Sequence, residues 1–312
     1  MTRTLESYED DYLLLRHTMG HQLKAAGNLL HGYLKHLNET GQNTLTVDTA
    51  LEWACLPAMA DPRTKAARLS AVRGFAAYVH AREPLLAAPV PAGLIPTRMI
   101  RQQPYIYGDS QVQALMRQAL SLQPATRGLT MQTLIGLMAS TGMRIGECVG
   151  LNLSDIDWAS GVLTVRGKRG NTRLVPIGHS TAAALQHYLH ASRAGVPACD
   201  PVPFFISSAG HRSHPSSLES AFRTLRAALG YTARPGGKAA RLHDLRHTFA
   251  TNALLQAYRD GVDVDARTVT LATYLGHVSP ASTYWYLTAI PELLAIVEER
   301  VSAAQHQGEL LS

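Results

Sequence analysis

Residues 242–251 read Leu-His-Asp-Leu-Arg-His-Thr-Phe-Ala-Thr and predict the start of a helix with three basic side chains in its first turns. His243 and Arg246 stand three residues apart, so they share one helix face and can grip a single anion near the N-terminus. His243 and His247 have the i, i+4 spacing of a zinc site, but the glutamate of an HExxH motif is missing. The sequence therefore predicts an anion site without a metal, with His247 as a packing or supporting residue.

About a hundred residues upstream, the stretch 141–151 reads Thr-Gly-Met-Arg-Ile-Gly-Glu-Cys-Val-Gly-Leu. Gly142 and Gly146 bracket Arg144 where one predicted helix ends and the next begins. Glycines on both sides let the backbone and the guanidinium approach a ligand closely. The alternative is an ordinary surface arginine in a turn between two helices.

A basic hairpin lies between these two stretches, at residues 165–177, which read Val-Arg-Gly-Lys-Arg-Gly-Asn-Thr-Arg-Leu-Val-Pro-Ile. Its turn holds Lys168 and Arg169, and Arg173 opens the return strand. A lysine in such a turn can enter a groove beside a phosphate. The alternative is a hairpin whose charges are simply solvated.

A tyrosine-rich stretch follows at residues 274–287, which read Tyr-Leu-Gly-His-Val-Ser-Pro-Ala-Ser-Thr-Tyr-Trp-Tyr-Leu. It combines His277 with Tyr284 and Tyr286. A tyrosine hydroxyl has a pKa of about 10, so a nucleophilic role requires cations and hydrogen bonds around it. The alternative is an aromatic pair in a hydrophobic core.

Patterning divides the chain into two predicted domains. Residues 1–88 repeat apolar side chains at helical spacing and predict an all-α bundle of four helices, while the proline-rich residues 89–104 predict an extended linker. Residues 105–312 predict an α+β domain that is mostly helical and has a small antiparallel β-meander. Its first elements are expected as helices at 109–121 and 127–140 and as strands at 151–156, 162–166 and 173–177.

Composition favours a polyanionic partner. The net charge is +6 and the pI about 9.3, and residues 99–312 hold most of the excess, with 19 Lys and Arg against 14 Asp and Glu. The three cysteines, Cys55, Cys148 and Cys199, show neither a disulfide framework nor a zinc pattern. The N-terminus is unlike a signal peptide and no apolar run approaches the ~18 residues of a membrane span, so we expect a cytoplasmic protein.

In this order and spacing, the motifs of residues 100–303 resemble the tyrosine recombinase (phage integrase) family. The resemblance implies a role for each matching residue. Arg144 and Arg246 would hold the scissile phosphate, and His243 and His277 would add hydrogen bonds or accept a proton. Lys168 would protonate the leaving 5′ oxygen, and Glu147 would orient the arginine and the histidine. The family tyrosine follows the Leu-Gly-His histidine by nine residues, which indicates Tyr286 as the nucleophile and disfavours Tyr284.

The resemblance also implies a reaction and partners. The tyrosine attacks DNA to give a 3′-phosphotyrosine and a free 5′-hydroxyl, with neither a metal nor another cofactor. Residues 1–88 would be a SAM-like core-binding domain, in which Lys65, Arg68 and Arg73 contact phosphates, as Arg169 and Arg173 do in the catalytic domain. The expected assembly on a specific double-stranded site is a dimer and then a tetramer, with exchange of the helix at 291–303 and with accessory DNA-bending proteins.

Two details refine this expectation. Arg169 directly after the lysine and a longer stretch at 257–268 favour a mobile-element integrase over the subgroup that resolves chromosome dimers. Two other functions stay open: a type IB topoisomerase, which has a similar set of site residues but only relaxes DNA, and a DNA-binding accessory protein without catalysis.

Overall fold

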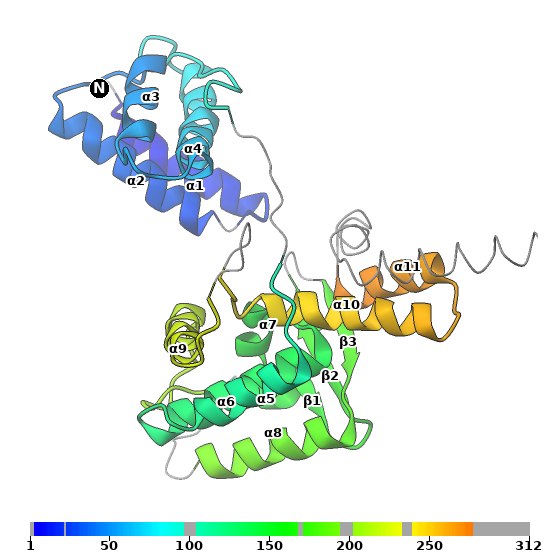
Figure 1. The fold of residues 1–312 in the computed structure, drawn as a ribbon. Coiled ribbons are helices and arrows are strands. Elements are labelled where there is room, and N and C mark those ends of the chain that lie inside the picture. The colour runs from blue at the N-terminus through cyan, green and yellow to red at the C-terminus, as the bar shows by residue number, and fades with distance from the viewer. Residues whose placement is uncertain are drawn as a thin grey trace, which may run out of the picture. The chain divides into compact units, whose positions relative to one another are not determined.

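The computed structural model describes residues 3–21, 23–96, 104–167, 171–193, 202–232 and 239–276. The chain divides into two compact units, residues 1–100 and 101–312 (Figure 1). Each unit has a hydrophobic core of its own.

The described residues of unit 1 form four helices, α1 (Leu5–Thr18), α2 (Lys24–Glu39), α3 (Val47–Cys55) and α4 (Pro62–His80). Local sequence explains where two of them begin. Thr46 and Thr49 form a reciprocal capping box at the start of α3, and Asp61 caps α4 with Pro62 in the first helical position. The centre of the unit consists of fully or almost fully buried side chains: Leu30, Tyr33, Leu37, Trp53, Val72 and Phe75.

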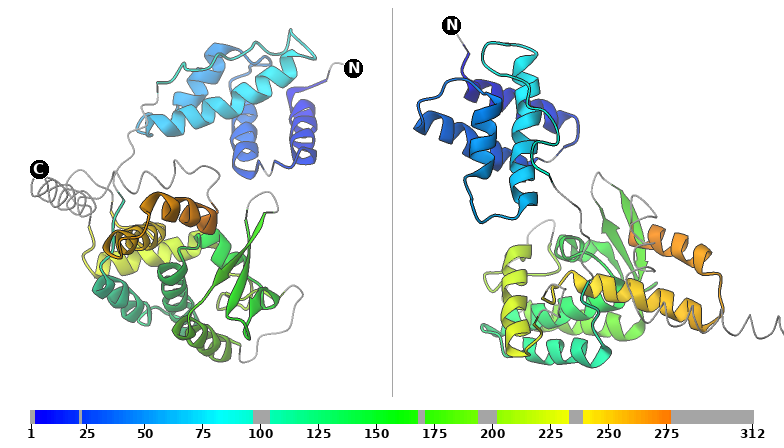
Figure 2. Two further views of the ribbon diagram at one scale, coloured as in Figure 1. Left: turned by 90° about the vertical axis from the view of Figure 1, so that its right-hand side faces the viewer. Right: turned by 45° about the horizontal axis from the view of Figure 1, so that its top comes forward.

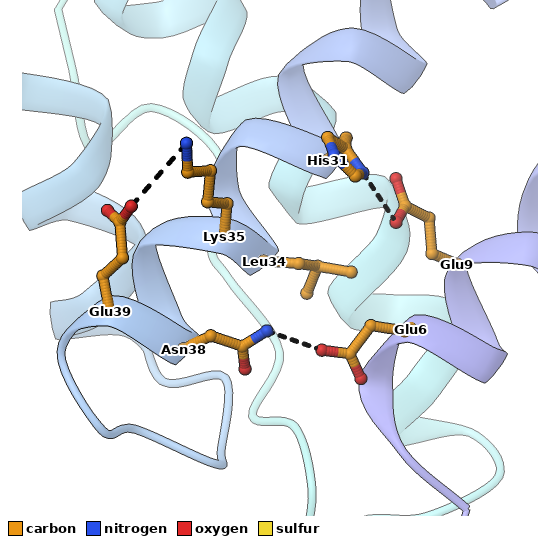
Figure 3. A pocket seen from close by; sticks show the side chains of 7 residues that line it. All are labelled: Glu6, Glu9, His31, Leu34, Lys35, Asn38 and Glu39. Carbon is orange, nitrogen blue, oxygen red and sulfur yellow. Dashed lines mark hydrogen bonds and ion pairs between the residues drawn. The ribbon is translucent and has the colours of Figure 1, made fainter.

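A polar pocket lies between α1 and α2 (Figure 3). Asn38 Nδ2 donates a hydrogen bond of 2.8 Å to Glu6 at its rim. Glu9 points into the pocket although it is only 7% exposed, and Nδ1 of His31 lies 3.9 Å from its carboxylate. Burial raises the pKa of Glu9.

Unit 2 is built around α6 (Ala125–Thr141), which packs against α5 (Asp109–Ala119), α8 (His179–Ser192) and α10 (Asp244–Arg259). Its buried face includes Met131, Leu134, Ile135 and Met138. The other helices within the described part of this unit are α7 (Ile145–Gly150), α9 (Pro215–Ala228) and α11 (Val264–Leu275). The central position of α6 matters because the candidate site begins where this helix ends.

The predicted small antiparallel sheet is present, with strands β1 (Ile156–Asp157), β2 (Val162–Arg166) and β3 (Thr172–Pro176) in the order β1-β2-β3. Figure 2 shows it in green. The register pairs Val165 with Arg173 and Leu163 with Val175. Because side chains alternate along a strand, Arg173 shares a face with the fully buried Val175.

The strand predicted at 151–156 was largely wrong. Residues Leu153–Asp155 form a short 3₁₀ helix, η1, and only Ile156 reaches the sheet. Asp155 explains the difference, because its carboxylate accepts a hydrogen bond of 2.9 Å from the backbone N–H of Asn152 and closes a turn. Within the described residues, no helix is both long and apolar enough to cross a bilayer.

Candidate active site

The site begins at a sharp turn between α6 and α7. Gly142 ends α6 in the left-handed conformation, with φ of 64°, and a Cβ there would lie 2.5 Å from Phe249. Two residues later Arg144 starts α7 in extended backbone, and its side chain is 38% exposed. The glycine therefore lets the chain reverse closely against α10 and leaves the guanidinium partly open to solvent.

Arg246 lies in the first turn of α10 and is 1% exposed. Its Nη1 donates to the carbonyl oxygen of Gly142 at 2.8 Å, and its Nη2 donates to that of Leu275 at 2.7 Å. A buried cation requires such acceptors to offset its lost hydration. Arg246 thereby joins three elements, α10, the end of α6 and the end of α11.

Arg144 reaches the same end of α11. Its Nη1 lies 3.5 Å from the carbonyl oxygen of Leu275, and its Nη2 lies 3.3 Å from that of Gly276. The long distances make these weak hydrogen bonds. Two arginines that are 102 positions apart in sequence thus share one acceptor, the carbonyl oxygen of Leu275, two residues before His277.

Glu147 is the acidic centre of this arrangement and is 9% exposed. It accepts hydrogen bonds from the backbone N–H of Arg144 at 2.9 Å and from Nη1 of Arg144 at 2.8 Å. Arg173 donates to both of its oxygens, at 3.0 and 2.7 Å. Burial alone would raise the pKa of Glu147, but the bonds from Arg173 and Arg144 outweigh burial and lower it to about 2. The carboxylate is therefore ionised at neutral pH.

His243 precedes α10 and reaches the surface. Protein atoms packed around its ring, and next the charge of Arg246, lower the pKa of its imidazole, to which Arg144 contributes as well. The ring is therefore neutral at neutral pH and can accept a proton. Its edge-to-face neighbour is His247, with ring centroids 5.0 Å apart.

His247 and Asp244 support this helix start. Asp244 is 1% exposed and is held by Arg241, whose Nη2 donates to it at 2.7 Å. His247 Nε2 lies 4.0 Å from the same carboxylate. Within the part of the chain that the structure describes, no group of three or more His, Cys, Asp or Glu side chains could hold a metal ion.

The structure thus brings Arg144, Arg246, His243 and Glu147 near one another. That they hold an anion stays a prediction. Four other predicted site residues lie outside the described residues: Lys168, Arg169, His277 and Tyr286. Their predicted roles stay predictions.

Arg173 has a place that the sequence analysis missed. It was predicted to contact DNA, but its guanidinium faces Glu147 and its side chain is only 16% exposed. A signal was available in the sequence, because Arg173 lies two residues before Val175 and so on the same strand face as a core residue.

On α4 of unit 1, the three predicted phosphate contacts differ in their surroundings. Arg68 lies over the ring of Trp53, with its guanidinium carbon 3.7 Å from the ring centroid, and Nη2 donates to the carbonyl of Trp53 at 2.7 Å. Lys65 bonds the carbonyl of Ala58, and Arg73 bonds the Ser70 hydroxyl. Arg68 therefore already stabilises the bundle through its own contacts.

The family model described as Phage integrase family matches residues 108–292. The chain belongs to the phage integrase family. This integrase-family chain is 36% identical over 298 residues to a putative integrase/recombinase, y4rB, of Sinorhizobium fredii, across 93% of this chain and 95% of the relative. It is also 30% identical to the tyrosine recombinase XerD of Mycobacterium tuberculosis, across 90% of this chain and 91% of that protein.

Solved structures of other proteins share the fold of this integrase-family chain. The Tn1549 transposon integrase in complex with transposon right end DNA has a TM-score of 0.65 at 16% identity and covers 96% of this chain and 100% of its own. A lambda integrase dimer bound to a COC′ core site has a TM-score of 0.63 at 18% identity, with 91% and 77% covered. The helical architecture with a small antiparallel sheet is therefore that of the family.

Proposed function

We propose that the chain is a tyrosine-type site-specific DNA recombinase, which cleaves and rejoins DNA through a 3′-phosphotyrosyl intermediate without a cofactor. The observation that carries the proposal is the meeting of Arg144 and Arg246 at the carbonyl oxygen of Leu275, beside a neutral His243. Planar guanidinium groups suit the non-bridging oxygens of a phosphodiester, and two of them stabilise the charge of a pentacoordinate transition state.

The remaining steps follow from the chemistry of the predicted residues. The phenol oxygen of Tyr286 attacks phosphorus and gives up its proton, for which His243 is the acceptor. Lys168 donates a proton to the departing 5′ oxygen, and His277 adds a hydrogen bond to the phosphate. Attack of a 5′-hydroxyl from a partner strand reverses these steps and releases the tyrosine. One phosphodiester bond is exchanged for another, so no energy source is needed.

Unit 1 serves in this proposal as the core-binding domain, and its phosphate contacts come first from Lys65 and Arg73. The chain acts as a dimer on one double-stranded site and as a tetramer when two sites are joined, with exchange of the helix at 291–303 between protomers. Its origin is a mobile element. Arg169 directly after Lys168 and the longer stretch at 257–268 support this origin.

A direct test is covalent capture. The purified chain is incubated with nicked duplex fragments cut from the DNA that flanks its own coding sequence, and the reaction is stopped with detergent. Recombinase chemistry predicts protein–DNA adducts that survive detergent and that digest to a peptide on a 3′ phosphate. Fragments that are bound but never captured would instead support an accessory DNA-binding role.

A type IB topoisomerase would also give such adducts, so a second assay separates the two enzymes. Two marked copies of the captured site are placed on one supercoiled plasmid. Recombination predicts exchange of the markers, whereas relaxation of the plasmid with the markers unchanged favours the topoisomerase.

A further inference from the structure

The return strand of the hairpin sends an arginine inward, behind the arginine pair. Arg173, paired with Val165 across the sheet, directs Nη1 and Nη2 to the two oxygens of Glu147 in a bidentate pair. Its Nε is buried and makes no hydrogen bond. The donors of this guanidinium are therefore turned to the protein interior, away from any DNA phosphate.

The carboxylate that Arg173 holds also fixes Arg144 at two points, the backbone N–H and the guanidinium. A bidentate partner on the far side leaves the Glu147 oxygens little freedom to rotate away. Arg173 therefore acts on Arg144 through one intervening group.

Arg173 also lies beneath the end of α11. A Cβ built on Gly276 would lie 3.4 Å from Nη1 of Arg173 and 3.7 Å from its Cδ. Gly276 has φ of 65°, and its carbonyl oxygen is the one that Arg144 Nη2 approaches. The same side chain thus supports the carboxylate that orients Arg144 and the backbone turn that precedes His277.

We propose that Arg173 is a positioning residue of the recombinase site, which holds Glu147 so that Glu147 holds Arg144 in its phosphate-binding orientation. It is not a DNA contact. This inference rests on the proposed function for its effect on catalysis, but the link between Arg173 and Glu147 can be measured without DNA.

Among the residues that the structure describes, three guanidinium groups face Glu147: those of Arg144, Arg173 and Arg246, the last with Nη1 at 4.0 Å. The thiol of Cys148, whose pKa burial raises, stays neutral beside them. In Arg173→Gln, burial of Glu147 is opposed by fewer cations, so the pKa of its carboxyl must rise. Protonated Glu147 loses an acceptor site for Arg144, and this loss appears as the pH falls.

The first measurement is an NMR titration of the Glu147 carboxyl carbon in the free protein. We expect it to titrate at clearly higher pH in Arg173→Gln than in the wild type. The matched control is Arg166→Gln, which breaks the pair between Arg166 and Asp155, also 2.7 Å long and on the same hairpin. This control must leave the Glu147 titration unchanged. An unchanged titration in Arg173→Gln overturns the proposal.

The second measurement is the rate of adduct formation on the captured nicked duplex, expressed as variant over wild type at each pH. For Arg173→Gln we expect a loss of about 100-fold near pH 6 that becomes smaller near pH 8, because a reacting group shifted by about 1 Å can cost this much. Arg166→Gln should give the same ratio at every pH. A loss in Arg173→Gln that is equal at all pH values would mean a purely structural role and overturns the proposal.

Two further readouts complete the test. Arg173→Lys keeps the positive charge, so its rate of adduct formation and its Glu147 pKa should lie between those of Arg173→Gln and those of the wild type. If Arg173→Gln does not fold, both measurements are made on Arg173→Lys. In both variants, DNA affinity and its dependence on salt concentration should match the wild type. If the slope of log binding constant against log salt concentration is smaller by about one unit, Arg173 contacts a phosphate and the proposal is overturned. If the wild type forms no adducts, the proposed recombinase function is wrong. The titration of Glu147 would still test whether Arg173 holds this carboxylate, because it needs no DNA.

Discussion

Replacing Gly142 by alanine tests whether the turn between α6 and α7 is fixed by packing as well as by backbone conformation. At φ of 64°, a residue other than glycine costs roughly 1–2 kcal/mol. The new Cβ would also lie 2.5 Å from Cδ1 of Phe249 and 3.0 Å from Cδ2 of Leu275, and overpacking of a core costs roughly 1–3 kcal/mol. Together these effects lower the free energy of unfolding by about 2–5 kcal/mol.

The control is Gly261→Ala in the same unit. Gly261 has φ of 71° but no atom within 4 Å of a built Cβ, so only the backbone cost of about 1–2 kcal/mol applies. Thermal unfolding should place Gly142→Ala on the order of 10 °C below the wild type, with Gly261→Ala lowered much less. The carbonyl of Gly142 binds Arg246, so adduct formation should fall as well. Equal melting temperatures for the two variants would refute the packing part of this reasoning.

Three other predictions concern the nucleophile, the imidazole and the pocket of unit 1. Tyr286→Phe should abolish covalent capture and keep DNA affinity, measured by gel shift; adducts that persist would move the nucleophile to Tyr284. Because the pKa of His243 is lowered, its imidazole stays neutral and able to accept a proton at pH values below the usual His pKa of about 6.5. The rate of adduct formation should therefore stay level from about pH 8 to about pH 6.5 and fall only at lower pH. A rate that begins to fall above about pH 6.5 would contradict this. Because the pKa of Glu9 is raised, the stabilising contribution of this carboxyl is present below the usual Glu pKa and is lost as the pH rises through the pKa in the folded state. Glu9→Gln should therefore raise the melting temperature at pH 7 and match the wild type below about pH 4. A lower melting temperature of Glu9→Gln at neutral pH would show that the charge of Glu9 is stabilised.

Much of unit 2 could be predicted from short-range patterns. The strand at 162–166 and the helix predicted at 127–140 appear nearly as expected, because alternation and helical spacing of apolar residues reflect a buried face directly. The strand expected at 151–156 failed because a side chain overrode the pattern. Asp155 accepts from Asn152 and turns the backbone into a 3₁₀ helix, a local hydrogen bond that apolar periodicity does not detect.

The order and spacing of the motifs in the sequence were enough to identify the family and to predict that Arg144, His243 and Arg246 act on one anion. Short stretches of sequence carry this information, because the type of each side chain and the glycines beside it limit the chemistry that the side chain can do. Which groups hold them in place was decided only by the tertiary structure. Arg173 looked like a surface cation of a basic hairpin, but folding puts it against Glu147, 26 residues away in sequence. The buried carboxylate needs cationic partners, and only the packing of β2 against α7 and of β3 against α11 determines which cations lie within reach.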